Sequence, residues 1–133
     1  MKLTTKSEYS ILALIYIARR WKKGYVKVEE ISEKYDIPKK YLEHLLLVLK
    51  QTRILKAKRG ARGGYELAIP PSKVSLAQII RLMDGALAPI ESASLYFFSH
   101  TPLEKERKII GVLKGVRDYV SKKLEKLKLS DLV

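Results

Sequence analysis

The chain has 133 residues, of which 47% are hydrophobic, and this combination is typical of one folded domain and excludes general disorder. Its 27 Lys and Arg residues outnumber its 14 Asp and Glu residues, which gives a formal net charge of +13 at pH 7. The absence of cysteine excludes disulfides, thiolate metal sites, cysteine-held iron–sulfur clusters and cysteine nucleophiles.

The positive charge lies mainly in the first half of the chain. Residues 1–65 contain 16 Lys and Arg and 6 Asp and Glu, whereas residues 66–133 contain 11 and 8. Such an asymmetry indicates an anionic partner that docks on the first half, although solubility or a thermophilic composition would explain the charge without a partner.

No apolar run reaches the roughly 20 residues of a membrane helix. Because the first residues lead into a helix and not into a signal peptide, we expect a cytoplasmic protein without a membrane partner.

Residues 5–23 are predicted to form the first helix. Residues 5–8 have the spacing of a capping box, in which Thr5 caps the start of the helix and the Glu8 side chain, three residues later, accepts a hydrogen bond from the Thr5 amide. Apolar residues then follow on most faces as far as Ala18. We therefore expect this helix to lie under other elements or at a subunit contact.

Residues 29–50 contain a short helix, a break and a longer helix. Residues 36–38 (Asp-Ile-Pro) form the break, because proline is tolerated only in the first turn of the helix that follows. The longer helix has a buried stripe with helical spacing, which consists of Leu42, Leu45, Leu46 and Leu49. This order is typical of a helix-turn-helix, whose second helix enters the major groove of DNA, and equally of a plain helical hairpin.

Residues 54–67 are predicted to form a β-hairpin with a basic, glycine-rich tip. Residues 56–65 contain four basic residues and three glycines and no acid. Arg59 and Arg62 stand at the tip, where they could meet a phosphate backbone or a narrow minor groove. Alone, this is an ordinary basic hairpin. Directly after a helix-turn-helix it indicates a winged helix, and hence a mainly α fold with one small hairpin.

Residues 75–85 are predicted to form a helix, and residues 86–103 are predicted to be an irregular connection. Residues 75–78 form a second capping box, and Gly85 is a typical terminator. The connection contains Tyr96, Phe97 and Phe98. We expect this aromatic cluster to pack under the last helix; lining a ligand pocket or touching a partner are the alternatives.

The last helix is predicted to run from Glu104 to about Leu127. Its narrow apolar stripe resembles a coiled-coil seam and consists of Ile109, Leu113, Val116, Val120, Leu124 and Leu127. A helix of about 24 residues is about 36 Å long and reaches beyond a compact domain of this size. We therefore expect the stripe to pack against its own copy in a homodimer; folding back on its own domain is the alternative.

The predicted organisation is a winged helix-turn-helix DNA-binding domain in residues 1–85, a connecting loop in residues 86–103, and a dimerisation helix and tail in residues 104–133. No pair of carboxylates, Ser-His-Asp set, phosphate loop or metal motif rises above chance in the sequence. We therefore expect the chain not to be an enzyme.

Four segments resemble the Rrf2 family of prokaryotic transcription regulators, namely residues 1–6 (MKLTTK), 37–43 (IPKKYLE), 59–65 (RGARGGY) and 129–132 (LSDL). The resemblance covers nearly the whole chain, and the wing segment is among its most specific parts. The family includes the iron–sulfur cluster regulator, the nitric-oxide-sensing repressor and the cysteine-metabolism repressor. The resemblance implies a homodimer, joined by the long helix, that binds double-stranded DNA at a two-fold operator, as a repressor.

The resemblance also implies which side chains contact DNA. The side chains that face the major groove are Lys39, Lys40, Tyr41 and Glu43. The wing contributes Lys58, Arg59 and Arg62, with Arg59 in the minor groove. The side chains near phosphates are Thr4, Thr5 and Lys6. An acid at position 43 can accept a hydrogen bond from a cytosine amino group. A pair with Lys39 or Lys40 within the same helix would explain Glu43 as well.

The chain departs from the cluster-binding members of the family in one respect. Those members carry three cysteines in the loop before the long helix, whereas residues 86–103 contain none. We therefore expect no iron–sulfur cluster and no cofactor, as in the cluster-less branch, whose members can respond to a small molecule, to a protein effector, or to no known effector. The alternative function is a winged-helix protein-interaction module with little DNA specificity.

Overall fold

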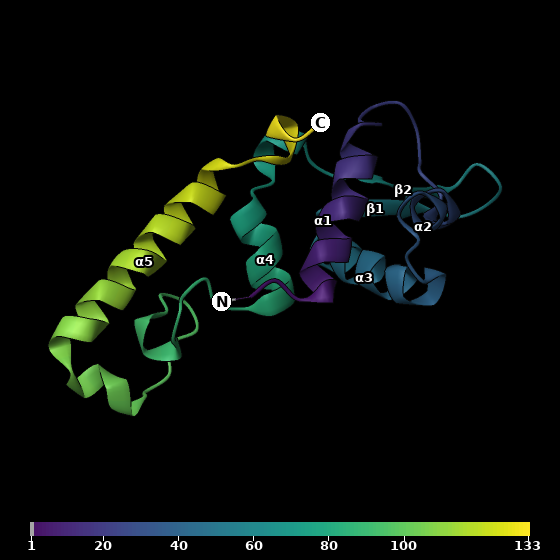
Figure 1. Cartoon of the computed structure of the whole chain (residues 1–133). Coiled ribbons are helices and arrows are strands. Elements are labelled where there is room, and N and C mark those ends of the chain that lie inside the picture. Colours follow the sequence, from purple (N-terminus) through teal and green to yellow (C-terminus); the bar gives the residue numbers. More distant parts are fainter. Residues whose placement is uncertain (1) are drawn as a thin grey trace.

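Three helices and a hairpin form the first half of the molecule, whose computed structural model describes residues 2–133. In chain order these elements are α1 (Thr5–Ala18), α2 (Val28–Tyr35), α3 (Lys39–Gln51), β1 (Leu55–Lys58) and β2 (Gly64–Leu67). Figure 1 shows α1, α2 and α3 packed together beside the hairpin. The predicted mainly α fold with a winged helix-turn-helix is confirmed.

The turn between α2 and α3 is short because one residue takes a left-handed backbone. Asp36 has φ of 54°, a conformation that Asp tolerates better than most residues. The Ser32 hydroxyl donates to the carbonyl of Ile37 at 2.6 Å, and the amide of Ile37 returns to the carbonyl of Ser32 at 3.1 Å. Pro38 then stands at the N-cap of α3, so the predicted break at residues 36–38 is confirmed.

The core lies between α1, α2 and α3. The predicted stripe on α3 is buried, and none of its four leucines is more than 2% exposed. Three of them, Leu42, Leu46 and Leu49, form one cluster with Leu14 and Ile17 from α1 and Ile31 from α2. Because burial of such a side chain contributes about 1.5–3 kcal/mol, this stripe fixes the orientation of α3 and leaves its other face to solvent.

The hairpin is held to the helices by a third extended segment. β1 and β2 are antiparallel, with Leu55 opposite Leu67 and Lys58 opposite Gly64. Val26 exchanges two backbone hydrogen bonds with Tyr65, at 2.7 and 2.8 Å, just before α2 begins. The base of the wing is therefore fixed to the start of the helix-turn-helix.

Helix α4 (Leu76–Asp84) packs against α1 and is joined to the C-terminal tail. The Ser75 hydroxyl accepts from the amide of Gln78 at 3.1 Å, and Gly85, with φ of 87°, ends the helix as predicted. The tail returns to the core, where Leu129 is fully buried and donates its amide to the carbonyl of Val74 at 2.9 Å. The last residues therefore pack with the winged helix as well as following the long helix.

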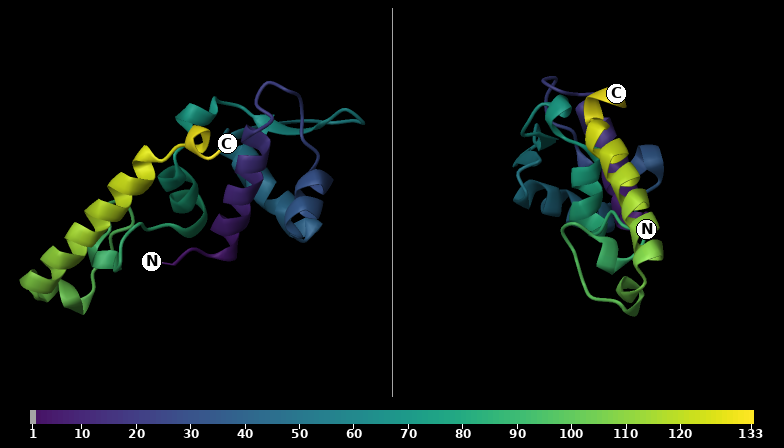
Figure 2. Two further views of the ribbon diagram at one scale, coloured as in Figure 1. Left: turned by 45° about the horizontal axis from the view of Figure 1, so that its top comes forward. Right: turned by 90° about the vertical axis from the view of Figure 1, so that its left-hand side faces the viewer.

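Helix α5 (Arg107–Lys126) extends away from the winged helix, so that α5 and the wing lie at opposite ends of the molecule (Figure 1 and Figure 2). It begins three residues later than expected because residues 102–105 form a separate 3-10 turn and Glu106 is extended. The segment before it folds along α5, where Arg117 donates to the carbonyl of Ala93 at 3.0 Å. No helix within residues 2–133 is both long and apolar enough to cross a membrane.

Candidate nucleic-acid interface

The face of α3 opposite the leucine stripe is open to solvent. Its exposed side chains are Lys39, Lys40, Glu43, His44, Leu47 and Lys50. Three of these, His44, Leu47 and Lys50, were not among the predicted contacts, although their spacing along α3 places them on the same side. A helix with such an open, polar face fits the major groove, which is about 12 Å wide.

One cation on α3 already has acidic partners. Lys39 Nζ lies 2.9 Å from Glu29 Oε1 on α2 and 3.9 Å from Glu43 Oε1 one turn along α3. Its hydrogen bond to Glu29 lowers the pKa of that carboxyl and raises the pKa of Lys39. Because Lys39 and Glu29 are both about half exposed, water screens the pair, and a phosphate can replace it. The alternative explanation of Glu43, a pair within α3, exists here only as the long contact to Lys39.

Two glycines of the wing, Gly63 and Gly64, lie where a Cβ would clash with the backbone. A Cβ on Gly63 would lie 2.1 Å from the carbonyl oxygen of Lys58, and one on Gly64 would lie 2.3 Å from that of Val26. The amide of Gly63 donates to the carbonyl of Gly60 at 3.0 Å and closes the tip. The glycine-rich sequence is therefore required by the close approach of the backbone.

The cations of the wing tip face solvent. Lys56 pairs across the strands with Glu66 at 3.1 Å, and this hydrogen bond raises the pKa of Lys56. Lys58, Arg59 and Arg62 are exposed, and none of the ion pairs found within residues 2–133 includes them. Their charge is therefore available to an anionic partner.

The N-terminal segment meets α3 and α4 in a hollow of about 310 Å³. Its lining consists of Thr4, Thr5, Lys6, Tyr41, Met83 and Asp84. Thr4, not Thr5, is the N-cap of α1, so the predicted capping box at residues 5–8 is wrong. The Thr4 hydroxyl does not turn back to its own helix because it donates to the carboxylate of Asp84, which also accepts from the Thr4 amide at 3.1 Å.

Tyr41 is half-buried where the N-terminal segment meets α3. Its ring packs edge-on against Tyr9 of α1, with 5.8 Å between the ring centroids. Part of its side chain is therefore committed to packing, and the part that lines the hollow faces Thr5 and Lys6. The structure thus brings the predicted contacts into three groups: the open face of α3, the wing tip, and this hollow.

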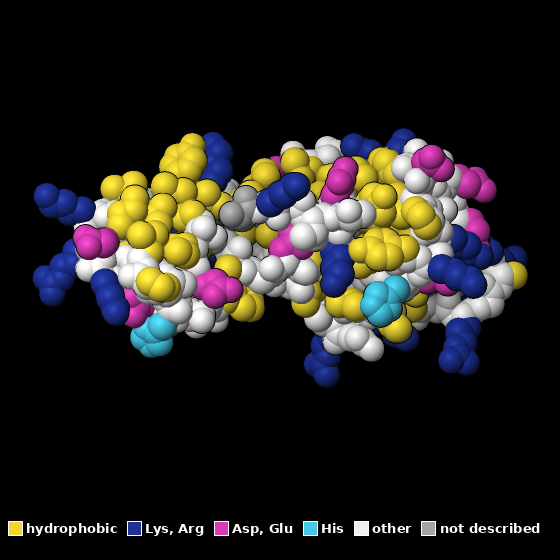
Figure 3. Space-filling view, turned by 60° about the horizontal axis from the view of Figure 1, so that its bottom comes forward, with side chains coloured by type: hydrophobic (Ala, Val, Ile, Leu, Met, Phe, Trp, Pro, Cys, Tyr) yellow, Lys and Arg dark blue, Asp and Glu magenta, His cyan; other side chains and the backbone are white. Residues whose placement is uncertain are grey.

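The predicted dimer residues on α5 do not share one environment. Ile109 and Val116 are exposed, Leu113 and Val120 are half-buried, and Leu124 and Leu127 pack against the core of their own chain. Exposed apolar side chains also occur at two positions that were not predicted, Val112 (61% exposed) and Tyr119 (70% exposed). We define the α5 stripe as Ile109, Val112, Val116 and Tyr119. Figure 3 shows hydrophobic side chains gathered over the end of the molecule that holds α5.

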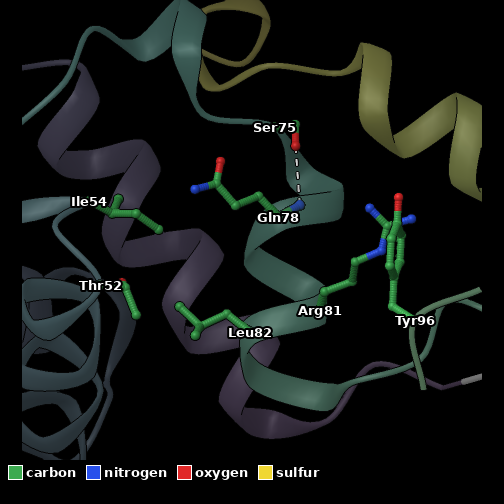
Figure 4. A pocket seen from close by; sticks show the side chains of 7 residues that line it. All are labelled: Thr52, Ile54, Ser75, Gln78, Arg81, Leu82 and Tyr96. Carbon is green, nitrogen blue, oxygen red and sulfur yellow. Dashed lines mark hydrogen bonds between the residues drawn. The ribbon is translucent and has the colours of Figure 1, made fainter.

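The aromatic cluster before α5 is exposed. Tyr96, Phe97 and Phe98 are 69%, 47% and 53% exposed, so the prediction that they pack under the last helix is wrong. Tyr96 borders a second hollow, of about 420 Å³ (Figure 4), which Thr52, Ile54, Ser75, Gln78, Arg81 and Leu82 also line. There the Arg81 guanidinium lies over the Tyr96 ring, 4.7 Å from its centroid. This hollow is lined by the end of α3 and by α4 and is separate from the hollow at Thr4.

A helix-turn-helix with an open basic face, a cationic wing and a long additional helix define a winged-helix protein of the kind found in transcription regulators. The model of one family, described as Rrf2, iron-dependent transcriptional regulator, matches residues 3–133, and the chain belongs to this family. The resemblance noted from the sequence is thereby confirmed.

Relatives and solved structures agree with this assignment. A Synechocystis sp. protein named as a helix-turn-helix-type regulator is 46% identical over 89 residues, 67% of this chain and 60% of that protein. CymR of Bacillus subtilis, a transcriptional regulator, is 30% identical over 132 residues, 99% of this chain and 89% of CymR. The structure of CymR, described as the global cysteine regulator of B. subtilis, has a TM-score of 0.79 at 28% identity, covering 99% of this chain and 95% of that one.

The IscR structure of T. potens is also similar, with a TM-score of 0.76 at 27% identity and coverage of 99% of this chain and 85% of that one. The match to the Synechocystis relative spans only 60% of the length of that protein.

The residues of this chain do not fit a cysteine-held iron–sulfur cluster. The sequence has no cysteine to supply thiolate ligands. In the described part of the chain, no three His, Asp or Glu side chains lie close enough together to hold a metal ion. His100, in the segment before α5, instead lies 2.9 Å from Glu104.

Proposed function

We propose that the chain is a homodimeric, sequence-specific DNA-binding transcription regulator that acts as a repressor without an iron–sulfur cluster. The single observation that carries the proposal is the set of exposed cations without acidic partners on the wing, beside the open face of α3. Lys56, at the base of the same hairpin, is paired with Glu66, whereas none of the ion pairs found within residues 2–133 includes Lys58, Arg59 or Arg62 at its tip. A phosphate backbone supplies the missing anions.

The two types of predicted contact have different consequences for binding. Side chains of α3, led by Lys40 and Glu43, would read base edges in the major groove, and Arg59 would enter the minor groove. Thr5 and Lys6, at the hollow beside Tyr41, would contact phosphates and carry no sequence information. Affinity should fall steeply with salt, because counterions are released for each neutralised phosphate.

A second copy of the chain would double the surface that contacts DNA. In a dimer joined at the α5 stripe, the two-fold axis relates the two α3 helices, which then read two half-sites about 34–36 Å apart on one face of the duplex. An inverted repeat is the operator that such a symmetry requires. A dimer seated on a promoter would exclude the transcription machinery, which makes occlusion the simplest mechanism of regulation.

The test compares Arg59→Ala with Lys6→Ala on a selected duplex and on a random duplex, by fluorescence anisotropy at several salt concentrations. We expect Arg59→Ala to lose about tenfold on the selected duplex and less on the random one. Lys6→Ala should weaken both alike and reduce the slope of log affinity against log salt by about 1.

Lys122→Ala, which removes an exposed cation from α5, is the matched control and should leave both affinities unchanged. Equal losses on both duplexes for Arg59→Ala and Lys6→Ala would contradict the division of labour. A wild-type protein that prefers no duplex would contradict sequence-specific binding altogether.

A second candidate function is a protein-interaction module that keeps the winged-helix fold. The observation that favours it is the exposed apolar surface of the α5 stripe and of the aromatic cluster, since exposed apolar patches mark contact sites. The absence of any preferred duplex, together with a stable complex with another protein on size exclusion, would support this candidate over DNA binding.

A further inference from the structure

One carboxylate joins the start of α1 to the end of α4. Asp84 is the last residue of α4 and Thr4 is the N-cap of α1, 80 positions away in the sequence. The Thr4 amide donates to Oδ2 of Asp84 at 3.1 Å, and the Thr4 hydroxyl donates to Oδ1. Both polar groups of Thr4 that could otherwise turn toward DNA are therefore committed to this carboxylate.

The carboxylate is held in its charged form. Burial alone would raise the pKa of Asp84, but the hydrogen bonds from Thr4 outweigh it, and the pKa lies below its ordinary value. A negative charge is also favourable beside the positive end of a helix, as here at the start of α1. The contact between Asp84 and Thr4 is thus a charge-assisted pair of hydrogen bonds, which is the stronger kind.

The end of α4 that carries Asp84 is itself fixed. One turn earlier, Arg81 pairs with Glu125 of α5 at 2.9 Å, and its guanidinium lies against the ring of Tyr96 (Figure 4). The helix that carries Asp84 is therefore fixed by contacts with α1 and α5, and the N-terminal segment is attached to it through Thr4.

We propose that Asp84 is a positioning residue for DNA binding, which holds Thr4 so that Thr5 and Lys6 present the first turn of α1 to the phosphates next to the part of α3 that carries Tyr41. The shared hollow of Thr4, Thr5, Lys6, Tyr41 and Asp84 carries this inference, because it places the anchor, the arm and α3 in one place. The inference rests on the proposed DNA-binding function and assigns to Asp84 a part in it that requires no contact with DNA.

The direction in which Asp84→Asn changes DNA affinity distinguishes a positioning role of Asp84 from a purely electrostatic one. A carboxylate near a phosphate backbone repels it, so removal of the charge by Asp84→Asn would tighten binding if charge alone mattered. Asn keeps one acceptor in place of two charged ones, so the arm is held less firmly. The positioning role therefore predicts weaker binding for Asp84→Asn, opposite to the electrostatic expectation.

The experiment measures the affinity of the full chain for a selected duplex and a random duplex, as a function of salt, for wild type, Asp84→Asn, Thr4→Val and the double variant. We expect each single variant to bind both duplexes about tenfold more weakly, with a shallower salt slope, because one phosphate contact is lost. The double variant should be no weaker than the worse single variant, since both changes break the same contact.

Asp36→Asn is the matched control. It removes the same charge at an exposed position of the winged helix, where Asn also tolerates the left-handed backbone. Its affinity should be equal to that of wild type or slightly higher. Circular dichroism and thermal unfolding of every variant check the fold, and if Asp84→Asn is unfolded, Thr4→Val alone decides, because it retains the carboxylate.

The outcomes distinguish the two proposals. A wild-type protein that binds no duplex overturns the proposed function. A wild-type protein that binds DNA, with folded Asp84→Asn and Thr4→Val variants that bind as tightly or more tightly, overturns the positioning role and leaves the proposed function standing.

Discussion

The two ends of the molecule treat their apolar side chains in opposite ways. In the winged helix, Leu14, Leu42 and Leu46 are fully buried within their own chain, and charges cover the outside. At the other end, Val112 and Tyr119 of α5 are well over half exposed, and the aromatic cluster in the segment before α5 is exposed as well. The first end buries its apolar side chains within a single chain, whereas the second exposes the apolar surface on which the proposed dimer contact rests.

The largest expected change in stability comes from shortening a buried side chain in the winged helix. Leu46→Ala removes a fully buried side chain from the middle of the core and should lower the free energy of unfolding by about 2–5 kcal/mol. Urea denaturation measures it. The matched substitution at the other end, Val112→Ala, should change the free energy of unfolding of the single chain by less than about 0.5 kcal/mol. Similar losses for both would contradict the contrast between the two ends.

The next effect concerns assembly. Val112→Glu places a charge in the α5 stripe and should weaken the association of two copies about 100-fold, because an unpaired charge would be buried at the contact. Sedimentation equilibrium measures the dissociation constant. Lys114→Glu, a larger change of charge at an exposed position two residues away, is the control and should leave association nearly unchanged. Equal association constants for Val112→Glu and wild type would show that α5 is not the contact.

Glycines provide a third comparison between the two ends. Gly64→Ala would bring a Cβ to 2.3 Å from the carbonyl oxygen of Val26, at φ of 138°, and should lower the free energy of unfolding by about 1–3 kcal/mol. Gly111→Ala in α5 meets no atom within 4 Å and should raise it by about 0.5–1 kcal/mol. Thermal unfolding measures both shifts. A stabilised Gly64→Ala would contradict the close packing of the wing on the segment before α2.

The smallest effect is a pH dependence at the winged-helix end. The Glu30 carboxylate accepts from the amide of Lys27 at 2.9 Å and from Arg20 at 3.0 Å, and these hydrogen bonds lower its pKa. A carboxyl whose pKa is lower in the folded state stabilises the fold above its unfolded pKa of about 4.3. This contribution is lost as the pH falls through the folded-state pKa.

Urea denaturation between pH 3 and pH 7 should therefore show the free energy of unfolding falling below about pH 4. Glu30→Gln should be less stable than wild type at pH 7 and should show a shallower fall. Glu33→Gln, at an exposed position of the same helix, should reproduce the wild-type curve. A curve for Glu30→Gln that is parallel to wild type would rule out this group as a source of the pH dependence.

Local spacing rules explain why the winged helix was predictable. Leu42 to Leu49 repeat with the period of a helix, Pro38 marks where it begins, and the glycines of the wing mark a tight tip. Each of these signals depends on neighbours in the sequence. The Rrf2 resemblance rests on the same local segments, so the fold and the open face of α3 followed from residues close together in the chain.

The remaining features depend on contacts between residues far apart in the chain. No rule of spacing connects Thr4 with Asp84, and the N-cap of α1 is Thr4, one residue before the predicted Thr5. On α5, apolar residues occupy two neighbouring faces, one that packs at Leu124 on the core and one that is exposed at Val112. The predicted seam ran along the boundary between these faces, because periodicity cannot tell which apolar face is covered by the same chain.

In the proposed dimer, two copies joined at α5 read two half-sites of one duplex with α3 and the wing. Selection of bound duplexes from a random pool with the wild-type protein tests this arrangement. We expect enrichment of an inverted repeat whose half-site centres lie about 10–10.5 base pairs, or a multiple, apart. Enrichment of a single unrepeated site, or of no sequence at all, would contradict it.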